Sequence, residues 1–541
     1  MSTKNSRYNI RLPFLLSLAI AGGIFLGANM TSSNGSHSDL IKSVHKFREI
    51  LSYIDQNYVD EVETDHLVES AISDMLEKLD PHTVYIPAED QELTQSQLDG
   101  NFSGIGIEYN IFRDTIYVVA PLSGGPSERI GLLAGDKILK VDEENVAGIG
   151  INNRGVLDRL RGPKGTTVGV TIMRKNVNEF LEFEIERDKI PQFSVDVSYM
   201  VDHEIGYIKV NRFSATTYDE FKSALNKLNE QGLKKLILDL TGNPGGYMDK
   251  AIKMADEFLS NDPMNVFTKG KESRYNQEHR ARRSGDFEHG PLIVMIDEGS
   301  ASASEIVSGA IQDNDRGLIV GRRSFGKGLV QMPIDLNDGS ELRLTISRYY
   351  TPSGRSIQKP YSDGTEDYYS DGFYNRYSNG EMFSVDKIKV NDSLKYETAK
   401  GRTVYGGGGI VPDYFVPLDT TYSSSYLNRL FTTNTIREYS LTYSEENKEK
   451  LEKMGFEAFY KKFEVTDKML KRLVEVAENN KLTYNEKQFL RSEPLIKTYL
   501  KAQIARGVWN NDGFYPIFNQ TNEIFKEALK LFEEAEQLAQ R

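Results

Sequence analysis

Residues 291–313 read PLIVMIDEGSASASEIVSGAIQD and carry the clearest indication of the fold. The apolar run PLIVMID predicts a buried strand, and EIVSGAIQD has the three- and four-residue spacing of a helix. A serine on the small-residue turn between them, such as Ser302, can present its hydroxyl at the carboxyl edge of a sheet, beside the free N–H groups of a helix N-terminus. Ser302 and Glu305 also form a capping-box pattern, so the turn has a structural explanation as well.

The chain on both sides of this stretch repeats the alternation of strand and helix. Over residues 191–420, the apolar strands IGYIKVN, KLILDL and GLIVG alternate with helix-period segments such as YDEFKSALNKLNE and MDKAIKMADEFLS. This order predicts an α/β layer with a mostly parallel sheet. Segment 361–400 is rich in Tyr, Asp, Gly and Ser, and we expect it to be a long surface excursion.

Four further regions differ in pattern from this α/β layer. Residues 1–36 contain three basic side chains and then an uncharged run at 12–29, which predicts a membrane anchor or signal segment and a linker. The run has no clean A-x-A cleavage site, which favours an uncleaved anchor, and the positive-inside rule then places the rest of the chain outside the cytoplasm. Residues 37–100 are helix-patterned, residues 101–190 form a β-rich module, and residues 421–541 form a helical domain.

Composition removes several classes of function. The formal net charge is −13 without a basic block, which argues against a nucleic-acid partner. The chain has no cysteine, which excludes disulfides, cysteine nucleophiles and Cys-based zinc sites. The seven histidines form no HxxxH or HExxH pattern, so the sequence does not predict a histidine metal site.

Lys327 is the second candidate for chemistry. It lies in GRRSFGKG, residues 321–328, which nearly matches the phosphate-binding pattern GxxxxGK[ST]. Gly328 replaces the hydroxyl that would bind Mg²⁺, and the following LVQMPIDL reads as a strand instead of a helix, so a nucleotide site is disfavoured. On a strand, Lys327 and Gln331 share one face, and burial would lower the lysine pKa enough for a general base. A surface lysine is the structural alternative.

Two glycine-containing segments are the remaining candidates for a functional role. The turn TGNPGG at 241–246 follows the strand KLILDL, and its glycine N–H groups could bind an oxyanion, although a plain turn looks the same. The segment SGIGIE at 103–108 enters a predicted strand. A loop of this kind can hold a chain-terminal carboxylate while the ligand adds to the sheet as a strand.

Taken together, these segments resemble the C-terminal processing (tail-specific) peptidases, PDZ-containing proteases that use a serine and a lysine. The motifs GSASASEI, FGKGLVQ, NPGG, TPSGRSIQ and VYGGGGIVPD carry the resemblance, which covers about residues 40–415. It implies a multidomain α/β protein that has a crotonase/ClpP-like α/β protease core, an inserted β-rich PDZ domain, and helical N- and C-terminal regions. The reaction implied is hydrolysis of peptide bonds through an acyl-enzyme, without a metal or organic cofactor.

The resemblance also implies a role for individual residues. Ser302 would be the nucleophile, Lys327 the general base and Gln331 the side chain that orients the lysine. The oxyanion would be bound by backbone N–H groups of Ala303 and of Gly245 or Gly246. Asp313 matches an aspartate that supports the site in some members of the family. The alternative is a helix-end residue without a role in catalysis. Arg161 matches an arginine that couples the PDZ domain to the active site. The expected PDZ ligand-binding residues are Gly104, Ile105, Gly106 and Ile107.

The expected partners and location follow from these assignments. Substrates would be proteins or peptides with apolar C-termini, at the outer side of a bacterial inner membrane, with the catalytic part in the periplasm. The sequence leaves open whether the chain forms a homo-oligomer or binds an adaptor protein. The competing function is a proteolytically silent PDZ scaffold that binds protein C-termini, and the presence of Ser302, Lys327 and Gln331 together argues against it.

Overall fold

The computed structural model describes residues 35–122, 124–175, 177–282, 284–362, 364–370 and 372–540, which form two compact units, 1–75 and 76–541. The first unit holds α2 (Gly35–Asn57) and most of α3 (Thr64–Glu77), where the apolar spacing predicted helices. The predicted anchor at 12–29 lies outside the described residues. Within the described ranges, no helix has the length and apolar character needed to cross a membrane.

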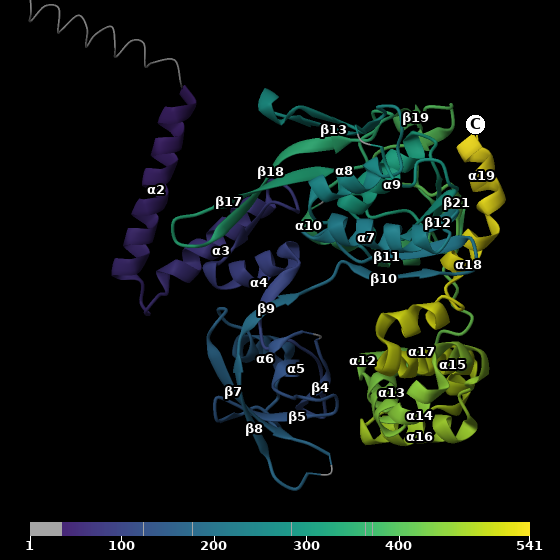
Figure 1. The fold of residues 1–541 in the computed structure, drawn as a ribbon. Helices are drawn as coiled ribbons and strands as arrows, with labels where there is room; N and C mark the ends of the chain where they lie inside the picture. The colour runs from purple at the N-terminus through teal and green to yellow at the C-terminus, as the bar shows by residue number, and fades with distance from the viewer. Residues whose placement is uncertain are drawn as a thin grey trace, which may run out of the picture. The chain divides into compact units, whose positions relative to one another are not determined.

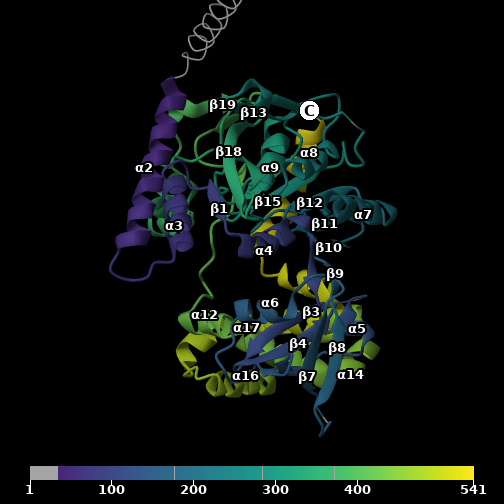
Figure 2. The ribbon, with the colours of Figure 1, turned by 90° about the vertical axis from the view of Figure 1, so that its left-hand side faces the viewer.

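The second unit is built around a six-stranded sheet in the order β10-β11-β12-β15-β16-β21 (Figures 1 and 2). Every neighbouring pair is parallel except β10 and β11. This arrangement is the one that the strand–helix alternation of 191–420 predicts. The bounds are β10 (Val195–Met200), β11 (Ile205–Val210), β12 (Lys235–Asp239), β15 (Leu292–Ile296), β16 (Leu318–Gly321) and β21 (Tyr414–Phe415).

Both faces of this sheet are covered, because side chains alternate between the faces of each strand. Leu236 and Leu238 pack under three helices, α7 (Thr217–Glu230), α8 (Met248–Asp256) and α9 (Ala303–Asp313). Ile237, between them, packs on the other face under α18 (Glu523–Lys530) and α19 (Phe532–Gln540). The predicted helical domain 421–541 therefore contains two helices that belong to the hydrophobic core of the α/β layer.

A second, antiparallel sheet holds the segment that follows Lys327. Its strand order is β1-β18-β13-β14, with β17 paired to β18. The bounds are β1 (Val84–Ile86), β13 (Met264–Gly270), β14 (Gln277–Arg280), β17 (Leu329–Asp335) and β18 (Glu341–Tyr350). A phosphate-binding loop requires a helix after its lysine, so strand β17 excludes the nucleotide-binding alternative.

The β-rich module is joined to the rest of the unit by the antiparallel pair β2 (Asn101–Gly104) and β9 (Asp188–Pro191). Its main sheet runs β3-β4-β5-β7-β8, so β3 is an edge strand. Helix α4 (Ala88–Asp99) precedes the module. The other bounds are β3 (Ile107–Phe112), β4 (Thr115–Pro121), α5 (Pro126–Arg129), β5 (Lys137–Val141), β6 (Glu144–Asn145), α6 (Asn153–Leu160), β7 (Thr167–Met173) and β8 (Leu181–Glu186).

Segment 361–400 is mostly exposed, as its composition predicts, but part of it is buried. Tyr368, Arg376 and Glu381 are buried, and Glu381 forms a two-point ion pair with buried Arg323. Polar residues can be buried in this way when their charges are paired, which composition alone does not reveal. The segment contains α10 (Thr365–Ser370), α11 (Tyr374–Ser378) and β19 (Lys395–Glu397), and β19 pairs with β20 (Thr403–Tyr405).

The remaining C-terminal helices enclose a separate apolar core. Trp509 packs there against the rings of Phe456 and Phe459. The longest helix, α17, is interrupted at Trp509 and Asn510, whose backbone angles are not helical. The bounds are α12 (Ser425–Thr432), α13 (Thr435–Glu446), α14 (Lys448–Met454), α15 (Phe456–Lys462), α16 (Asp467–Asn479) and α17 (Glu486–Phe518).

Candidate active site

Ser302 is the N-cap residue of α9, on the turn that leaves β15. Its φ of 55° and ψ of −110° lie in a region that non-glycine residues rarely adopt. Hydrogen bonds from the Ala301 N–H and the Ser304 hydroxyl to the Asn243 carbonyl hold the turn in place. Strained backbone of this kind is concentrated at functional sites, where the surrounding contacts impose it.

The NPGG turn packs directly against Ser302. A Cβ atom on Gly245 would lie 2.7 Å from Ser302 Cβ, and one on Gly246 would lie 2.1 Å from the Phe213 carbonyl oxygen, so both positions require glycine. The Gly245 N–H donates to Asn243 Oδ1 at 2.9 Å. Among the described residues, the N–H groups of Gly246 and Ala303 have no acceptor. These two donors remain for an oxyanion.

Lys327 and Ser302 line the same cavity of about 290 Å³. Burial, and to a lesser extent the positive charge of Arg343, lower the pKa of Lys327 to about 8. Lys327 Nζ donates to Gln331 Oε1 at 2.7 Å, and Gln331 Nε2 donates to the His82 carbonyl. Within the described part of the chain, Lys327 Nζ has no hydrogen bond to Ser302. The cavity therefore brings all three predicted catalytic side chains together, with the lysine held by Gln331.

A bulge lies beside Gln331 in the pairing of β17 with β18. Lys327 lies two residues before β17 instead of on it, and the pairing shifts between Val330 and Gln331, with the extra residue on β18. Leu329, Val330 and Gln331 all line the cavity, whereas strict alternation along a strand would turn Val330 to the other face.

Glu305 connects the serine turn to the lysine segment, a role beyond the capping box predicted from sequence. Its buried carboxylate accepts from the N–H groups of Ser302 at 2.8 Å and Lys327 at 2.9 Å. The Ser324 hydroxyl, at 2.5 Å, and the Gly326 N–H, at 2.7 Å, bind its other oxygen. Burial raises the pKa of Glu305 to about 7. One side chain therefore fixes the distance between the two reactive segments.

The turn at Asp80 is a part of the site that the sequence reasoning missed. The Asp80 carboxylate accepts from the N–H groups of His82 and Thr83, which shapes the turn. The turn presents the His82 carbonyl to Gln331. The His82 ring bonds to the Tyr368 hydroxyl at 2.9 Å, and burial together with the charge of Lys327 lowers its pKa to about 3. In the sequence, the Asp80-Pro81 dipeptide is typical only of the end of a helix.

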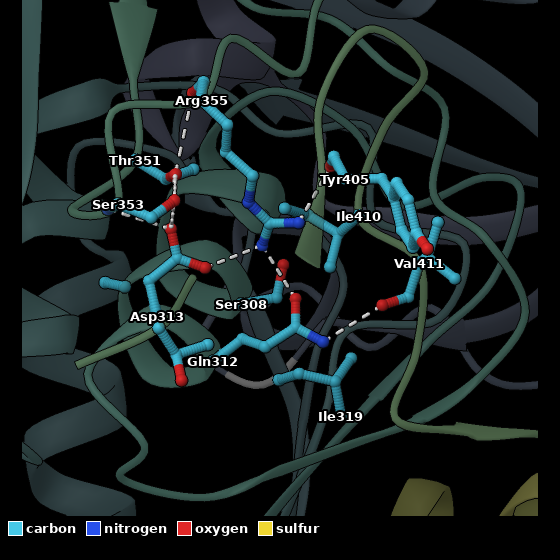
Figure 3. A network of polar contacts seen from close by, with 12 residues as sticks. Ser308, Gln312, Asp313, Ile319, Thr351, Ser353, Arg355, Tyr405, Ile410 and Val411 are labelled. Carbon is cyan, nitrogen blue, oxygen red and sulfur yellow. Dashed lines mark hydrogen bonds and ion pairs between the residues drawn. The ribbon is translucent and has the colours of Figure 1, made fainter. Parts of the chain in front are cut away.

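Asp313 lies at the opposite end of α9 from Ser302 and does not line the cavity. Its carboxylate pairs with the fully buried Arg355 at 2.7 Å and accepts from the Ser353 hydroxyl (Figure 3). Arg355 also donates to Gln312 Oε1 and to the Tyr405 carbonyl. These contacts bind the C-terminal end of α9 to the chain after β18. Asp313 therefore stabilises the packing of this helix end.

Arg161 connects the β-rich module to α4. Its guanidinium lies over the Phe102 ring, and its Nη1 donates to Ser96 Oγ of α4 at 3.2 Å. Gln95 and Leu98 of the same helix line the cavity that holds Ser302. A continuous set of contacts therefore runs from Arg161 through α4 to the candidate active site.

The predicted ligand loop precedes the edge strand β3. Ile105 and Ile107 are buried in the core of the module. Gly106 has a φ of 74°, and a Cβ atom there would lie 2.8 Å from Ile190 Cδ1, so the loop requires glycine at this position. Gly104 ends β2 and forms an isolated bridge with Arg161. An unpaired strand edge after a glycine loop is the arrangement that β-augmentation uses.

Comparison with known proteins finds similar sequences. The sequence model of peptidase family S41 matches residues 204–367, that of an activating-protease (CtpB) N-terminal domain matches 26–90, and that of a family of unknown function matches 426–510. A carboxy-terminal-processing protease of Bartonella bacilliformis is 37% identical over 62% of this chain and 78% of its own length. Carboxy-terminal processing protease CtpB of Bacillus subtilis is 34% identical over 66% and 75%. A solved photosystem II D1 C-terminal processing protease is 26% identical over 69% and 86%, with a TM-score of 0.35.

Proposed function

Since this chain belongs to peptidase family S41, with carboxy-terminal processing proteases as relatives, we propose that it cleaves peptide bonds with Ser302 as nucleophile and Lys327 as general base. The observation that carries the proposal is the shared cavity, in which burial holds the pKa of Lys327 at about 8. A lysine is a base only when neutral, and burial of the amine makes that form accessible near neutral pH.

The proposed reaction proceeds through an acyl-enzyme. Neutral Lys327 takes the proton of the Ser302 hydroxyl as the oxygen attacks the scissile carbonyl. The free N–H groups of Ala303 and Gly246 bind the oxyanion, and the proton on Lys327 passes to the leaving amine. A water molecule, deprotonated by Lys327, then hydrolyses the ester. Because the Gly245 N–H is bonded to Asn243, Gly246 is the glycine that we assign to the oxyanion hole.

Gln331 and Glu305 are positioning residues in this proposal. Gln331 Oε1 accepts one N–H of the amine, which leaves the lone pair of neutral Lys327 for the serine proton. Glu305 holds the backbone of both reactive residues through one carboxylate oxygen. Neither side chain exchanges a proton with substrate. The crotonase/ClpP-like description of the core is part of the same proposal, supported by the helix-covered parallel sheet.

We further propose that residues 101–190 are a PDZ domain that binds substrate C-termini. The glycine loop at 104–107 would hold the terminal carboxylate, and the free edge of β3 would pair with the substrate chain. Arg161 would transmit ligand binding to the cavity through Ser96 and α4. The proposed location, outside a bacterial inner membrane, rests on the charged and apolar pattern of residues 1–36.

The test is cleavage of an unstructured protein with an apolar C-terminus by the wild type, Ser302→Ala and Lys327→Ala. We expect both substitutions to reduce kcat/KM by about 10³-fold or more, as loss of a nucleophile or its base does in other serine proteases. Binding of the C-terminal tail should persist in both variants. If the wild type binds the tail and does not cleave, the silent-scaffold alternative replaces the peptidase. Cleavage by Ser302→Ala at the wild-type rate would refute the assignment of the nucleophile.

A further inference from the structure

The cavity that holds Ser302 and Lys327 contains one other charged side chain, that of Arg343 on β18. Most of the remaining wall is apolar and comes from α4, the start of α8, α9 and β17. A cation in such a place is costly unless it has a partner. Arg343 has a partner on one side only, because its Nε donates to Glu341 Oε1 at 2.5 Å.

The two terminal nitrogens of Arg343 are its remaining hydrogen-bond donors. Among the residues that the structure describes, neither has a hydrogen-bond acceptor, and 20% of the side-chain surface is exposed. A guanidinium is a planar fork whose N–H groups match the two oxygens of a carboxylate. With Nε held by Glu341, the two Nη groups are oriented and open to a ligand.

The charge of the cavity favours an anion. Lys327 and Arg343 are the two charged residues among the described ones that line it, and no carboxylate does so. Glu305 and Asp80 act on Lys327 from outside the cavity wall, and Glu341 binds Arg343 at Nε. When Lys327 is neutral, as general-base catalysis requires, Arg343 is the remaining cation of the wall. A substrate carboxylate would then have one fixed partner.

We infer that Arg343 is a substrate-binding residue that selects polypeptides with a carboxylate close to the scissile bond. The inference rests on the proposed peptidase activity, because the same cavity receives the scissile bond. Two sources provide this group: an Asp or Glu side chain beside the cleavage site, and the terminal carboxylate of a chain cut close to its end. Both present the same two oxygens to the guanidinium.

The experiment compares matched peptides. A peptide that the wild type cleaves is mapped by mass spectrometry, and Glu or Gln is placed at each of the two positions on either side of the scissile bond. A second pair is shortened so that the chain ends within three residues of that bond, with a free or an amidated terminus. kcat/KM is measured for wild type, Arg343→Gln and Arg343→Lys. Arg348→Gln is the matched control, because Arg348 lies on the same strand, is exposed and does not line the cavity.

The readout is the ratio of kcat/KM for the charged peptide to that for its neutral partner. We expect the wild type to prefer a carboxylate in at least one pair, and Arg343→Gln to reduce that preference by about tenfold or more, as loss of a charged hydrogen bond does. Arg343→Lys, which keeps the charge and lacks the fork, should retain part of it, and Arg348→Gln all of it. The pair that responds identifies the source of the carboxylate.

The ratio separates this role from an effect on Lys327. Loss of the Arg343 charge also changes the pKa of Lys327, but that change acts equally on both peptides of a pair and cancels in the ratio. An unchanged ratio in Arg343→Gln, for every pair, would overturn the inference and leave the peptidase proposal standing, provided that Ser302→Ala abolishes cleavage. If wild type and Ser302→Ala cleave equally, the proposed function itself fails.

Discussion

The pH dependence of peptide cleavage is the most direct test of the lysine base. Burial and the Arg343 charge lower the pKa of Lys327 from 10.5 to about 8. At pH 7, about 9% of the lysine is then neutral, against about 0.03% for a lysine at its ordinary pKa, so the environment increases the reactive form about 300-fold. Because only the neutral amine accepts the serine proton, kcat/KM should rise tenfold per pH unit below 8 and level off above it.

The assay is initial-rate cleavage of a peptide without ionisable side chains, measured from pH 6 to pH 9.5 at two temperatures. Glu305, whose pKa burial raises to about 7, ionises in the same range and needs a control. An ammonium loses its proton with a large positive enthalpy and a carboxylic acid does not. Warming should therefore shift the rising part of the pH–rate profile to lower pH if ionisation of Lys327 controls the rate. A rising part that does not shift with temperature, or a flat profile between pH 6 and 9, would refute the assignment of Lys327 as the base.

Four further predictions concern Glu305, the NPGG turn and the C-terminal helices. Glu305→Gln replaces one carboxylate oxygen by an amide NH₂ group that faces two donors, so we expect a loss of about 3 kcal/mol or more of stability and a lower kcat, measured by denaturation and kinetics. Ser324→Ala is the comparison, because it removes one of the four hydrogen bonds to Glu305 together with the acceptor of the Ile410 N–H. Since the folded-state pKa of Glu305 is raised, the folded protein binds its proton more tightly than the unfolded chain, and stability should fall as pH rises from 4.5 to about 7; Glu305→Gln should remove that slope. Gly246→Ala should unfold the NPGG turn or abolish activity. Gly242→Ala, at a position with open space on the same loop, should lower the free energy of unfolding by about 1 kcal/mol, as measured by thermal unfolding. Deletion of 523–540 should make the protein insoluble by uncovering Ile237 and its neighbours on the sheet, and a soluble, active product would contradict the assigned packing.

Sequence alone indicated those parts of the candidate site that lie in short segments. The serine turn, the NPGG turn and the lysine segment each keep a local pattern, because a strand-to-helix turn with small residues can be read from neighbours along the chain. Their combination led to the peptidase family, which the comparison with known proteins confirmed. The mostly parallel sheet followed from strand–helix alternation in the same way.

Only the tertiary structure decided which groups face the lysine and what covers the sheet. The His82 carbonyl is 249 residues from Gln331 in sequence, and α18 and α19 reach the sheet from the end of the chain. The buried part of segment 361–400 was not visible from composition, because Glu381 is paired with Arg323, which is 58 residues away in the sequence. In the sequence, nothing distinguishes Arg343 from other basic residues on strands. Only the folded structure shows that its guanidinium lines the cavity. Burial and long-range pairing set these roles, and both depend on contacts between residues that are far apart in the chain.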